Sequence, residues 1–243
     1  MIRSRSNTVT HKSGEPKRGS TACTVRTSHF LTFSSLCLLA AALIVGGCTG
    51  GSPRNEQHFI LEAVRQGGPV QPVADGSLQV HRFSVDAAFM AKNLIYRLGE
   101  FQYETDAYRQ FLISPGTMIA ERTRDWLAGS GLFSAVLPLG SRIVPDYTLE
   151  ANVIALYGDF TDQASPTAVM EIRFFLLENA AGREKVVHAE AYRVTNAVPS
   201  RGTEEFIDAL NRNLMEILTR LESDLQQVLA GRAQVPSARQ SRQ

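Results

Sequence analysis

The sequence predicts one α/β domain, a sandwich in which a mixed, mostly antiparallel β-sheet is packed by one short and one long C-terminal α-helix. Three alternating segments, residues 147–156, 168–177 and 186–195, are typical of strands with one buried face. A proline at residue 115 opens a shorter helical segment. Residues 203–228 carry apolar side chains at steps of three and four, which places them on one stripe of a long helix.

Short strands are expected before the first helix, at residues 58–63, 77–83, 93–97 and 101–104. In the second of them, Leu78, Val80 and Arg82 are predicted to share one face. A Leu-Gly-Glu sequence at residues 98–100 separates the last two strands, which predicts a hairpin.

Ser114 is expected to cap the first helix by accepting a hydrogen bond from a free backbone N–H, with Pro115 at the first helical position. The helix is expected to end near Gly129 or Gly131. A strand at residues 133–137 should follow.

Every second side chain defines the buried faces of the long strands. The first strand is expected to bury Tyr147, Leu149, Ala151, Val153 and Ala155. The second is expected to bury Ala168, Met170, Ile172, Phe174 and Leu176, opposite Glu171 and Arg173. An Ala-Ala-Gly sequence at residues 180–182 forms the turn to the third strand.

Thr203 is expected to begin the last helix, with Glu204 and Glu205 at its positive end. The apolar stripe of this helix comprises Phe206, Ile207, Leu210, Leu214, Ile217, Leu218, Leu221, Leu225 and Val228. Packing against the sheet is the expected role of the stripe, and domain swapping or oligomerisation through it is the alternative.

The start of the chain is typical of a bacterial lipoprotein signal. A basic stretch precedes an apolar run over residues 30–45, shorter than the roughly 20 residues that a membrane-spanning helix needs. Residues 45–48 then read Val-Gly-Gly-Cys, a hydrophobic residue and two small ones before the cysteine. We expect residues 1–47 to be removed and Cys48 to carry a diacylglycerol and an amide-linked chain such as palmitate. An uncleaved membrane anchor is the alternative, and Val25 is an alternative start.

Three zones are expected after the leader: a flexible tether at residues 48–56, a globular domain at 57–230 and a disordered tail at 231–243. Cys48 is the single cysteine outside the leader, so no disulfide framework is expected. Thr49 follows it where an aspartate commonly signals retention in the inner membrane. We therefore expect attachment to the outer membrane, facing the periplasm.

Charge and motifs indicate which functions to exclude. Removing the leader leaves 19 of the 25 basic residues and 23 of the 24 acidic ones, a net charge of −4, without the basic clusters that nucleic acid requires. His58, His81 and His188 lack the spacing of metal ligands. His188 with Glu190 could form an acid–base pair, but solvated strand neighbours are the favoured interpretation. We expect no enzymatic activity, no metal and no cofactor apart from the covalent lipid.

Four segments carry a resemblance to a known family: IYR at 95–97, YETDAYRQFLISPGTMI at 103–119, LAGSGLFSAVLP at 127–138 and PDYTLEANVIALYGDF at 145–160. In this order they resemble the ABC-type transport auxiliary lipoproteins, the paraquat-inducible protein C-like group. Phe111 stands where that family commonly has tryptophan. The resemblance covers nearly all of residues 57–229.

The resemblance implies a partner role. Family members are outer-membrane components of MCE-type (mammalian cell entry) systems, in which an inner-membrane ABC transporter or permease works with MCE-domain proteins to move phospholipid or other hydrophobic cargo. Members also form homo-oligomeric rings. This chain is accordingly expected to dock on an MCE-domain periplasmic protein.

An aromatic segment is the expected contact surface, since tyrosine and arginine are favoured anchors of interfaces. The residues expected to build or support it are Tyr96, Arg97, Tyr103, Tyr108, Phe111 and Pro115. Packing of the sheet edge under the helix is the alternative. Two other functions stay open: a periplasmic lipid carrier, and an assembly lipoprotein for other outer-membrane or cell-wall machinery.

Overall fold

The computed structural model describes residues 55–69, 74–180 and 182–233. The chain divides into two units, Met1–Pro53 and Arg54–Gln243, and the described residues belong to the second. The predicted signal peptide, the lipidation site Cys48 and most of the tether lie outside the described residues. In the part of the chain that is described, no helix is long and apolar enough to cross a membrane.

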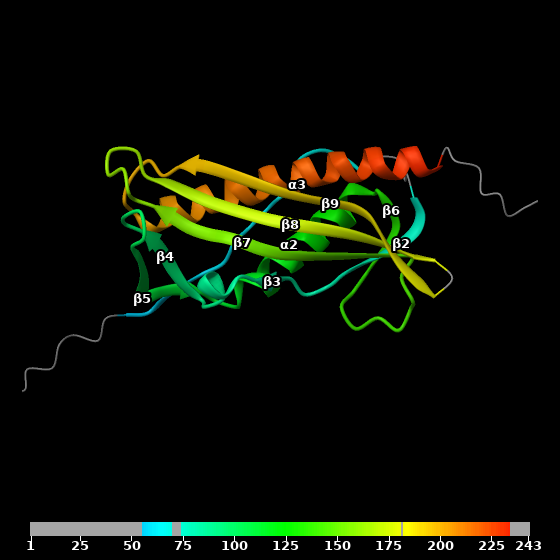
Figure 1. Ribbon diagram of the computed structural model, residues 1–243, viewed down its shortest axis with the longest axis horizontal. Helices are drawn as coiled ribbons and strands as arrows, with labels where there is room; N and C mark the ends of the chain where they lie inside the picture. Colours follow the sequence, from blue (N-terminus) through cyan, green and yellow to red (C-terminus); the bar gives the residue numbers. More distant parts are fainter. Residues whose placement is uncertain (1–54, 70–73, 181, 234–243) are drawn as a thin grey trace, which may run out of the picture. The chain divides into compact units, whose positions relative to one another are not determined.

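The predicted α/β fold is confirmed: one mixed sheet is packed by a short and a long helix (Figure 1). The elements, in chain order, are β1 Gln57–Phe59, β2 Ala74–Val80, β3 Ser84–Val85, the single-turn helix η1 Ala87–Phe89, β4 Asn93–Arg97, β5 Tyr103–Phe111, α2 Pro115–Ser130, β6 Phe133–Leu137, β7 Tyr147–Asp159, β8 Thr167–Ala180, β9 Arg183–Ala197 and α3 Thr203–Ala233.

Strand β7 organises the sheet. Along one edge it pairs in parallel with three shorter strands in succession, first β2, then β3, then β4. Along its other edge it pairs antiparallel with β8 over its whole length, and β8 pairs antiparallel with β9. The outer strands are β6 beside β2, and β5 with β1 beyond β4. At roughly 3.3 Å per residue, the 13 residues of β7 extend about 40 Å, which gives this domain two well-separated ends.

A bulge in β7 makes one predicted buried face wrong at its last residue, Ala155. Leu149, Ala151 and Val153 face the helices as expected, but the register shifts between Val153 and Ala155. An extra residue in a strand reverses the side on which later side chains lie. Ala155 therefore joins a small cluster with Ile95 on the other face of the sheet, and Leu156 returns to the main core. The alternation predicted for β8 and the turn at residue 182 hold.

The first two strands are shorter than predicted. Strand β1 stops at Phe59, and Leu61 packs on α2 instead: its N–H donates to Met118 Sδ and its carbonyl accepts from Arg122 Nε. Strand β2 ends at Val80, and Arg82 is exposed rather than inward-facing. The predicted hairpin of β4 and β5 is present.

Helix α2 begins and ends where the sequence predicts, but its cap differs. Ser114 Oγ bonds Thr117 Oγ1 at 2.9 Å and makes no side-chain bond to a backbone N–H. Its backbone carbonyl accepts the first regular hydrogen bond of the helix, from Met118 N. At the other end Gly131 takes a left-handed conformation, φ 74°, which is accessible to glycine at little cost.

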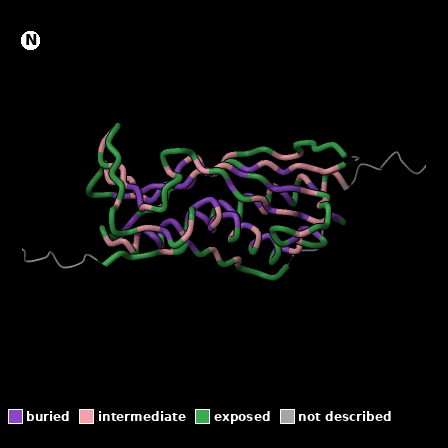
Figure 2. Tube along the Cα trace, turned by 90° about the horizontal axis from the view of Figure 1, so that it is seen from below, coloured by how far each residue is buried: buried purple, intermediate pink, exposed green. Residues whose placement is uncertain are grey.

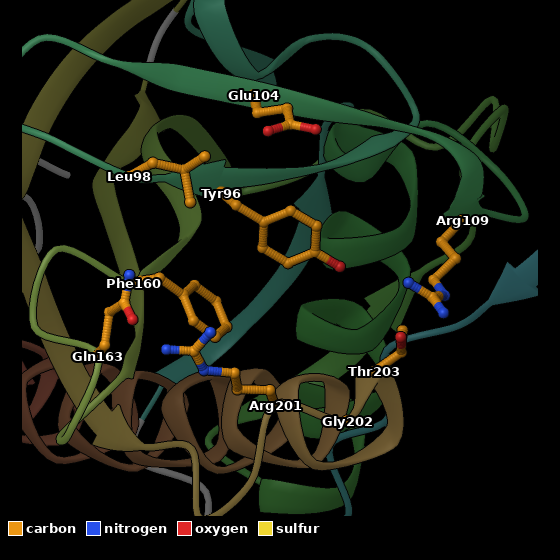
Figure 3. A pocket seen from close by; sticks show the side chains of 9 residues that line it. All are labelled: Tyr96, Leu98, Glu104, Arg109, Phe160, Gln163, Arg201, Gly202 and Thr203. Atoms are coloured by element: carbon orange, nitrogen blue, oxygen red, sulfur yellow. The ribbon is translucent and has the colours of Figure 1, made fainter.

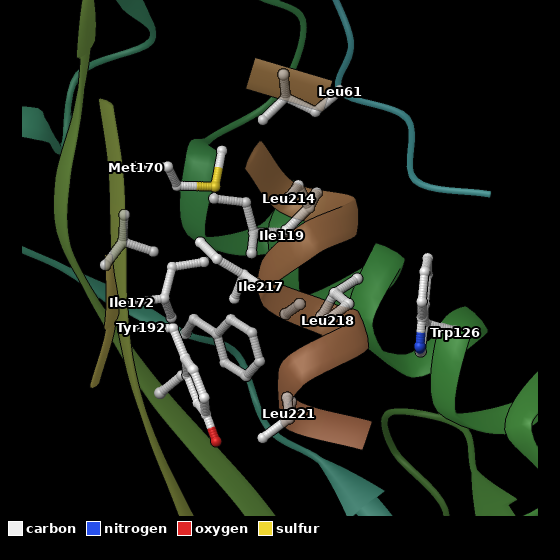
Figure 4. Close-up of a cluster of buried hydrophobic side chains, with 14 of the residues drawn as sticks. Leu61, Ile119, Trp126, Met170, Ile172, Tyr192, Leu214, Ile217, Leu218 and Leu221 are labelled. Carbon is white, nitrogen blue, oxygen red and sulfur yellow. The ribbon is translucent and has the colours of Figure 1, made fainter. Parts of the chain in front are cut away.

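Helix α3 packs its apolar stripe against β8 and β9, as expected, except that Val228 is half-buried and Leu229 takes its place in the core. In Figure 4 the labelled side chains of α3 meet Met170 and Ile172 of the sheet on one side, while Trp126 of α2 lies on the other. Buried positions gather in this interior and exposed ones on the periphery (Figure 2). The helix continues to Ala233, so residues 231–233 of the predicted disordered tail are helical.

A segment at residues 60–69, here called the strap, is clamped to both helices. The Arg65 guanidinium binds both carboxylate oxygens of Glu222 on α3, at 2.9 and 2.7 Å, and Trp126 Nε1 of α2 donates to the same carboxylate at 2.7 Å. Burial alone would raise the pKa of Glu222, but the bonds from Arg65 and Trp126 outweigh it and the pKa lies below its usual value. Ionised Glu222 therefore joins strap, α2 and α3.

Replacing Glu222 with glutamine should lower the free energy of unfolding by about 2 kcal/mol at neutral pH, because charge-assisted bonds to Arg65 are lost. A carboxyl whose folded-state pKa is depressed stabilises the fold above its unfolded pKa and loses that effect as pH falls through the folded pKa. The difference between the two proteins should thus shrink in acid. Urea denaturation across that pH range measures it.

Glu216→Gln on the same helix is the matched control, since the Glu216–Arg220 pair is about half exposed and should contribute under about 1 kcal/mol. Equal losses of unfolding free energy for the two variants would contradict a stabilising role for the Arg65–Glu222 pair.

Gly116 and Gly129 of α2 test how closely the two ends of this helix approach their neighbours. A Cβ on Gly116 would lie 2.3 Å from the backbone oxygen of Phe83, whereas one on Gly129 meets nothing nearer than Arg65 Cδ at 4.0 Å. Gly116→Ala should therefore cost about 1–3 kcal/mol by separating α2 from the sheet. Gly129→Ala should be neutral or stabilise by up to about 1 kcal/mol. Thermal unfolding of the two variants checks the contrast, and a stable Gly116→Ala protein would refute it.

Candidate functional site

The six residues predicted for a contact surface divide into three kinds. Phe111 and Pro115 are buried in the core, so packing is their role. Tyr96 and Arg97 are half-buried. Tyr103 and Tyr108 are the exposed members, with 48% and 40% of their surface accessible. All of them except Pro115 belong to the β4–β5 hairpin, which lies at one end of the long axis, here called the hairpin end (Figure 1).

Tyr96 holds the hairpin against the start of α3. Its ring meets Phe160 edge-on at 5.4 Å and Phe206 of α3 at 5.5 Å between centroids. Gly158 makes room for them, because a Cβ there would lie 2.6 Å from the Phe160 ring and 3.2 Å from each of the other two. The β7 bulge is what turns Gly158 toward these rings. Burial, reinforced by the charge of Asp106, raises the pKa of Tyr96 to about 12, so the hydroxyl keeps its proton.

Arg97 fixes the shape of the hairpin turn. Its guanidinium pairs with Asp159 at 3.2 Å and donates to the carbonyls of Gly99 and Glu100. Burial acts to raise the pKa of Asp159, but hydrogen bonds from Thr161 and the charge of Arg97 outweigh it and leave the pKa below its usual value. The turn is therefore held by an ionised pair at neutral pH.

Farther along β5, Asp106 interrupts the pairing with β4. Its carboxylate accepts from the N–H groups of Tyr108 and Arg109, at 2.9 and 3.0 Å, and from the Arg109 guanidinium at 3.3 Å. The register between β4 and β5 shifts at this point. Tyr108 consequently lies on an irregular part of the strand rather than in a regular ladder.

Two adjoining cavities lie beside the hairpin. The first, of about 300 Å³, is enclosed by Tyr96, Leu98, Glu104, Arg109, Phe160, Gln163, Arg201, Gly202 and Thr203 (Figure 3). The second, of about 570 Å³, shares Tyr96, Glu104 and Arg109 with it and reaches Asn55, near the first described residues. In Figure 3 the Tyr96 hydroxyl points toward the side of the first cavity where Thr203 and Arg109 lie. The mixed charges of Glu104, Arg109 and Arg201 give these cavities no single electrostatic character.

Sequence reasoning missed the most exposed apolar residue of the hairpin. Phe101 is 89% exposed and Leu98 is 40% exposed, both in the turn between β4 and β5. Phe101 was expected to begin a strand, but β5 starts only at Tyr103. The neighbouring Gly99-Glu100 sequence was the available signal that Phe101 lies in the turn.

The opposite end of the domain, here called the far end, has its own apolar loop. Between β6 and β7, Leu139, Ile143 and Val144 are 56%, 62% and 82% exposed. The loop is tied down where it meets β7: Asp146 accepts from the N–H and hydroxyl of Ser77. Figure 1 places this loop and the end of α3 at the end of the sheet opposite the hairpin.

The histidines lie apart from one another. His58 contacts Gln110, His81 lies 3.4 Å from Glu150, and His188 lies 3.2 Å from the Tyr192 hydroxyl, which donates to Asp224. Among the residues described, no group of three or more His, Cys, Asp or Glu side chains could hold a metal ion.

Several residues in the segments that carry the family resemblance make contacts that stabilise the fold. Arg97 in the first and Asp159 in the last form the pair that holds the hairpin turn. Gly131 ends α2, and Asp146 links the start of β7 to β2. These residues therefore account for a shared fold more directly than for a shared partner.

Comparisons with known proteins agree at the level of fold. No protein-family model matches the sequence, and no similar curated protein is found. Among solved structures, the chain is similar to protein XCC0632 from Xanthomonas campestris, described with the family model DUF330, at 18% identity and a TM-score of 0.61 over 73% of this chain and 97% of that one. A second crystal structure, of an uncharacterized protein, is similar at 13% identity and a TM-score of 0.54 over 70% and 99% of the two chains. The whole of each of these proteins thus shares the architecture of this domain.

Proposed function

We propose that this chain is a lipid-anchored, non-catalytic docking subunit of an MCE/ABC-type transport system that moves phospholipid or other hydrophobic cargo between the inner and outer membranes. Cys48 carries the lipid in the outer membrane, the domain faces the periplasm, and an MCE-domain protein is its direct partner. The Val-Gly-Gly-Cys sequence at residues 45–48 supports the anchor, and the family resemblance supports the partner.

The observation that carries the proposal is where the chain enters the folded domain. Asn55 lines the cavity beside Glu104 and Thr105, at the hairpin end. It is the seventh residue after Cys48, so even a fully extended link spans at most about 25 Å. A domain held within this distance of the outer membrane suits a subunit that docks a periplasmic partner there. Tethering also raises the effective concentration of the domain near that partner.

The bonds made by the described polar groups support a role without catalysis. Apart from the surface ion pairs, they serve structural bonds: Glu222 clamps the strap, and Asn213 joins α3 to the carbonyl of Ala168 and to Asn196. His188 and Tyr192 form a chain of bonds to Asp224 across the β9–α3 interface, and none of these three residues lines the two cavities beside the hairpin.

The lipid-carrier alternative would need space for an acyl chain between the sheet and α3. Side chains occupy that interface instead: Leu210, Leu214 and Leu218 are fully buried in one cluster with Met170 and Ile172 of β8. A filled core favours docking over carriage. The other alternative, assembly of outer-membrane or cell-wall machinery, differs only in the partner.

Crosslinking in cells followed by affinity capture of the tagged full-length protein tests the proposal. An MCE-domain protein should be recovered, and recovery should fall for Cys48→Ser, which cannot be acylated. Recovery of only barrel or wall-synthesis proteins would reject the transport role.

Two further variants address the contact surface. Tyr108→Ala should leave the protein soluble and folded but weaken capture, because the ring is exposed beside the hairpin cavity. Val186→Ala, at a comparably exposed apolar position of β9, is the matched control and should capture normally. Loss of soluble Tyr108→Ala protein would instead assign this ring to packing.

A further inference from the structure

We infer that the tip of the β4–β5 hairpin, Leu98 and Phe101, is a membrane-contact site that seats on the lipid bilayer to which the protein is anchored. The inference rests on the proposed anchor at Cys48 and adds to it a defined orientation of the domain. It assigns the exposed apolar tip to lipid rather than to a protein partner.

The first argument is the direction from which the chain arrives. Strand β1 pairs in parallel with β5, Gln57 opposite Arg109 and Phe59 opposite Phe111. Residues before Gln57 therefore lie toward the start of β5, which is the side of the hairpin turn. Asn55 accordingly contributes to the same cavity as Glu104 and Thr105. The described chain therefore begins on the hairpin side of the domain, beside the middle of β5, and not at the far end.

The second argument is reach. The seven steps from Cys48 to Asn55 bridge at most about 25 Å, whatever their conformation. A lipidated Cys48 lies at the bilayer surface, so the hairpin end must stay within that distance of the headgroups. The far end lies about 40 Å farther along β7.

The third argument is the chemistry and rigidity of the tip. Phe101 is 89% exposed and Leu98 is 40% exposed, an apolar pair that water solvates poorly. Phenylalanine and leucine side chains of membrane-surface segments bury at the boundary between headgroups and acyl chains. The Arg97 guanidinium holds the Gly99 and Glu100 carbonyls, so Phe101 is presented on a fixed turn and little conformational entropy is lost on contact.

A site-specific fluorophore tests the contact. Once Cys48 is acylated, the chain after the leader has no other cysteine, so Phe101→Cys can be labelled with nitrobenzoxadiazole alone. Val144→Cys, 82% exposed in the far-end loop, is the matched control. Each acylated protein is reconstituted into phosphatidylcholine vesicles containing lipid spin-labelled near the headgroup, and quenching of the fluorophore is measured.

Quenching should be several-fold greater, with a blue-shifted emission, for Phe101→Cys than for Val144→Cys. Equal quenching at the two positions, or none at either, would overturn the membrane contact. So would protection of the Phe101→Cys fluorophore by an added MCE-domain protein without quenching by lipid, which would make the tip a protein-docking surface.

Flotation of the same vesicle samples distinguishes failure of the tip contact from failure of the proposed function. Protein that floats with vesicles but shows no preferential quenching keeps its anchor and refutes the tip contact alone. Protein that does not float lacks the anchor, which contradicts both proposals.

Discussion

Burial of the α3 stripe against β8 and β9 is the constraint on which the rest of the domain depends. Ile172, Phe174 and Leu176 of β8 and the leucines of α3 are fully buried in one cluster, and α2 and the strap pack onto the same interior. Because α3 has 31 residues, the helix extends about 45 Å and demands long strands beneath it. The length of the domain therefore follows from this packing. The same length separates the hairpin end from the far end.

The bulge in β7 connects this core to the candidate site. By reversing the faces after Val153, it turns Gly158 toward Tyr96 and Phe206 and directs Tyr157 to the opposite face, where its ring stacks on Phe89. The hairpin is thus fastened on both sides of the sheet. Arg97 adds the ion pair to Asp159 that fixes the turn. A rigid tip follows from a single inserted residue in the central strand.

Periodicity predicted the regular elements well. The alternation in β8 and the stripe of α3 were correct because each pattern reports burial on one face, and burial is what stabilises those elements. Local patterns failed where tertiary contacts decide: Leu61 packs on α2 instead of extending β1, and Ala155 changes face at a bulge. The expected cap of α2 is also absent, because the Ser114 hydroxyl bonds Thr117 instead of a backbone N–H. In the candidate site, Tyr103 and Tyr108 are exposed, as a contact surface requires, but the buried places of Phe111 and Pro115 depend on the tertiary fold. Phe101 was missed because exposure in a turn has no periodic signal.

Lipid attachment at Cys48 is the central claim, since the docking role and the orientation of the hairpin both depend on it. The most direct measurement is mass spectrometry of the N-terminal peptide of the protein extracted from cells grown with an alkyne-bearing fatty acid. The account predicts a peptide that begins at Cys48 and carries a diacylglycerol and an amide-linked acyl chain. A peptide that begins upstream of Cys48, or one with an unmodified cysteine, would contradict it.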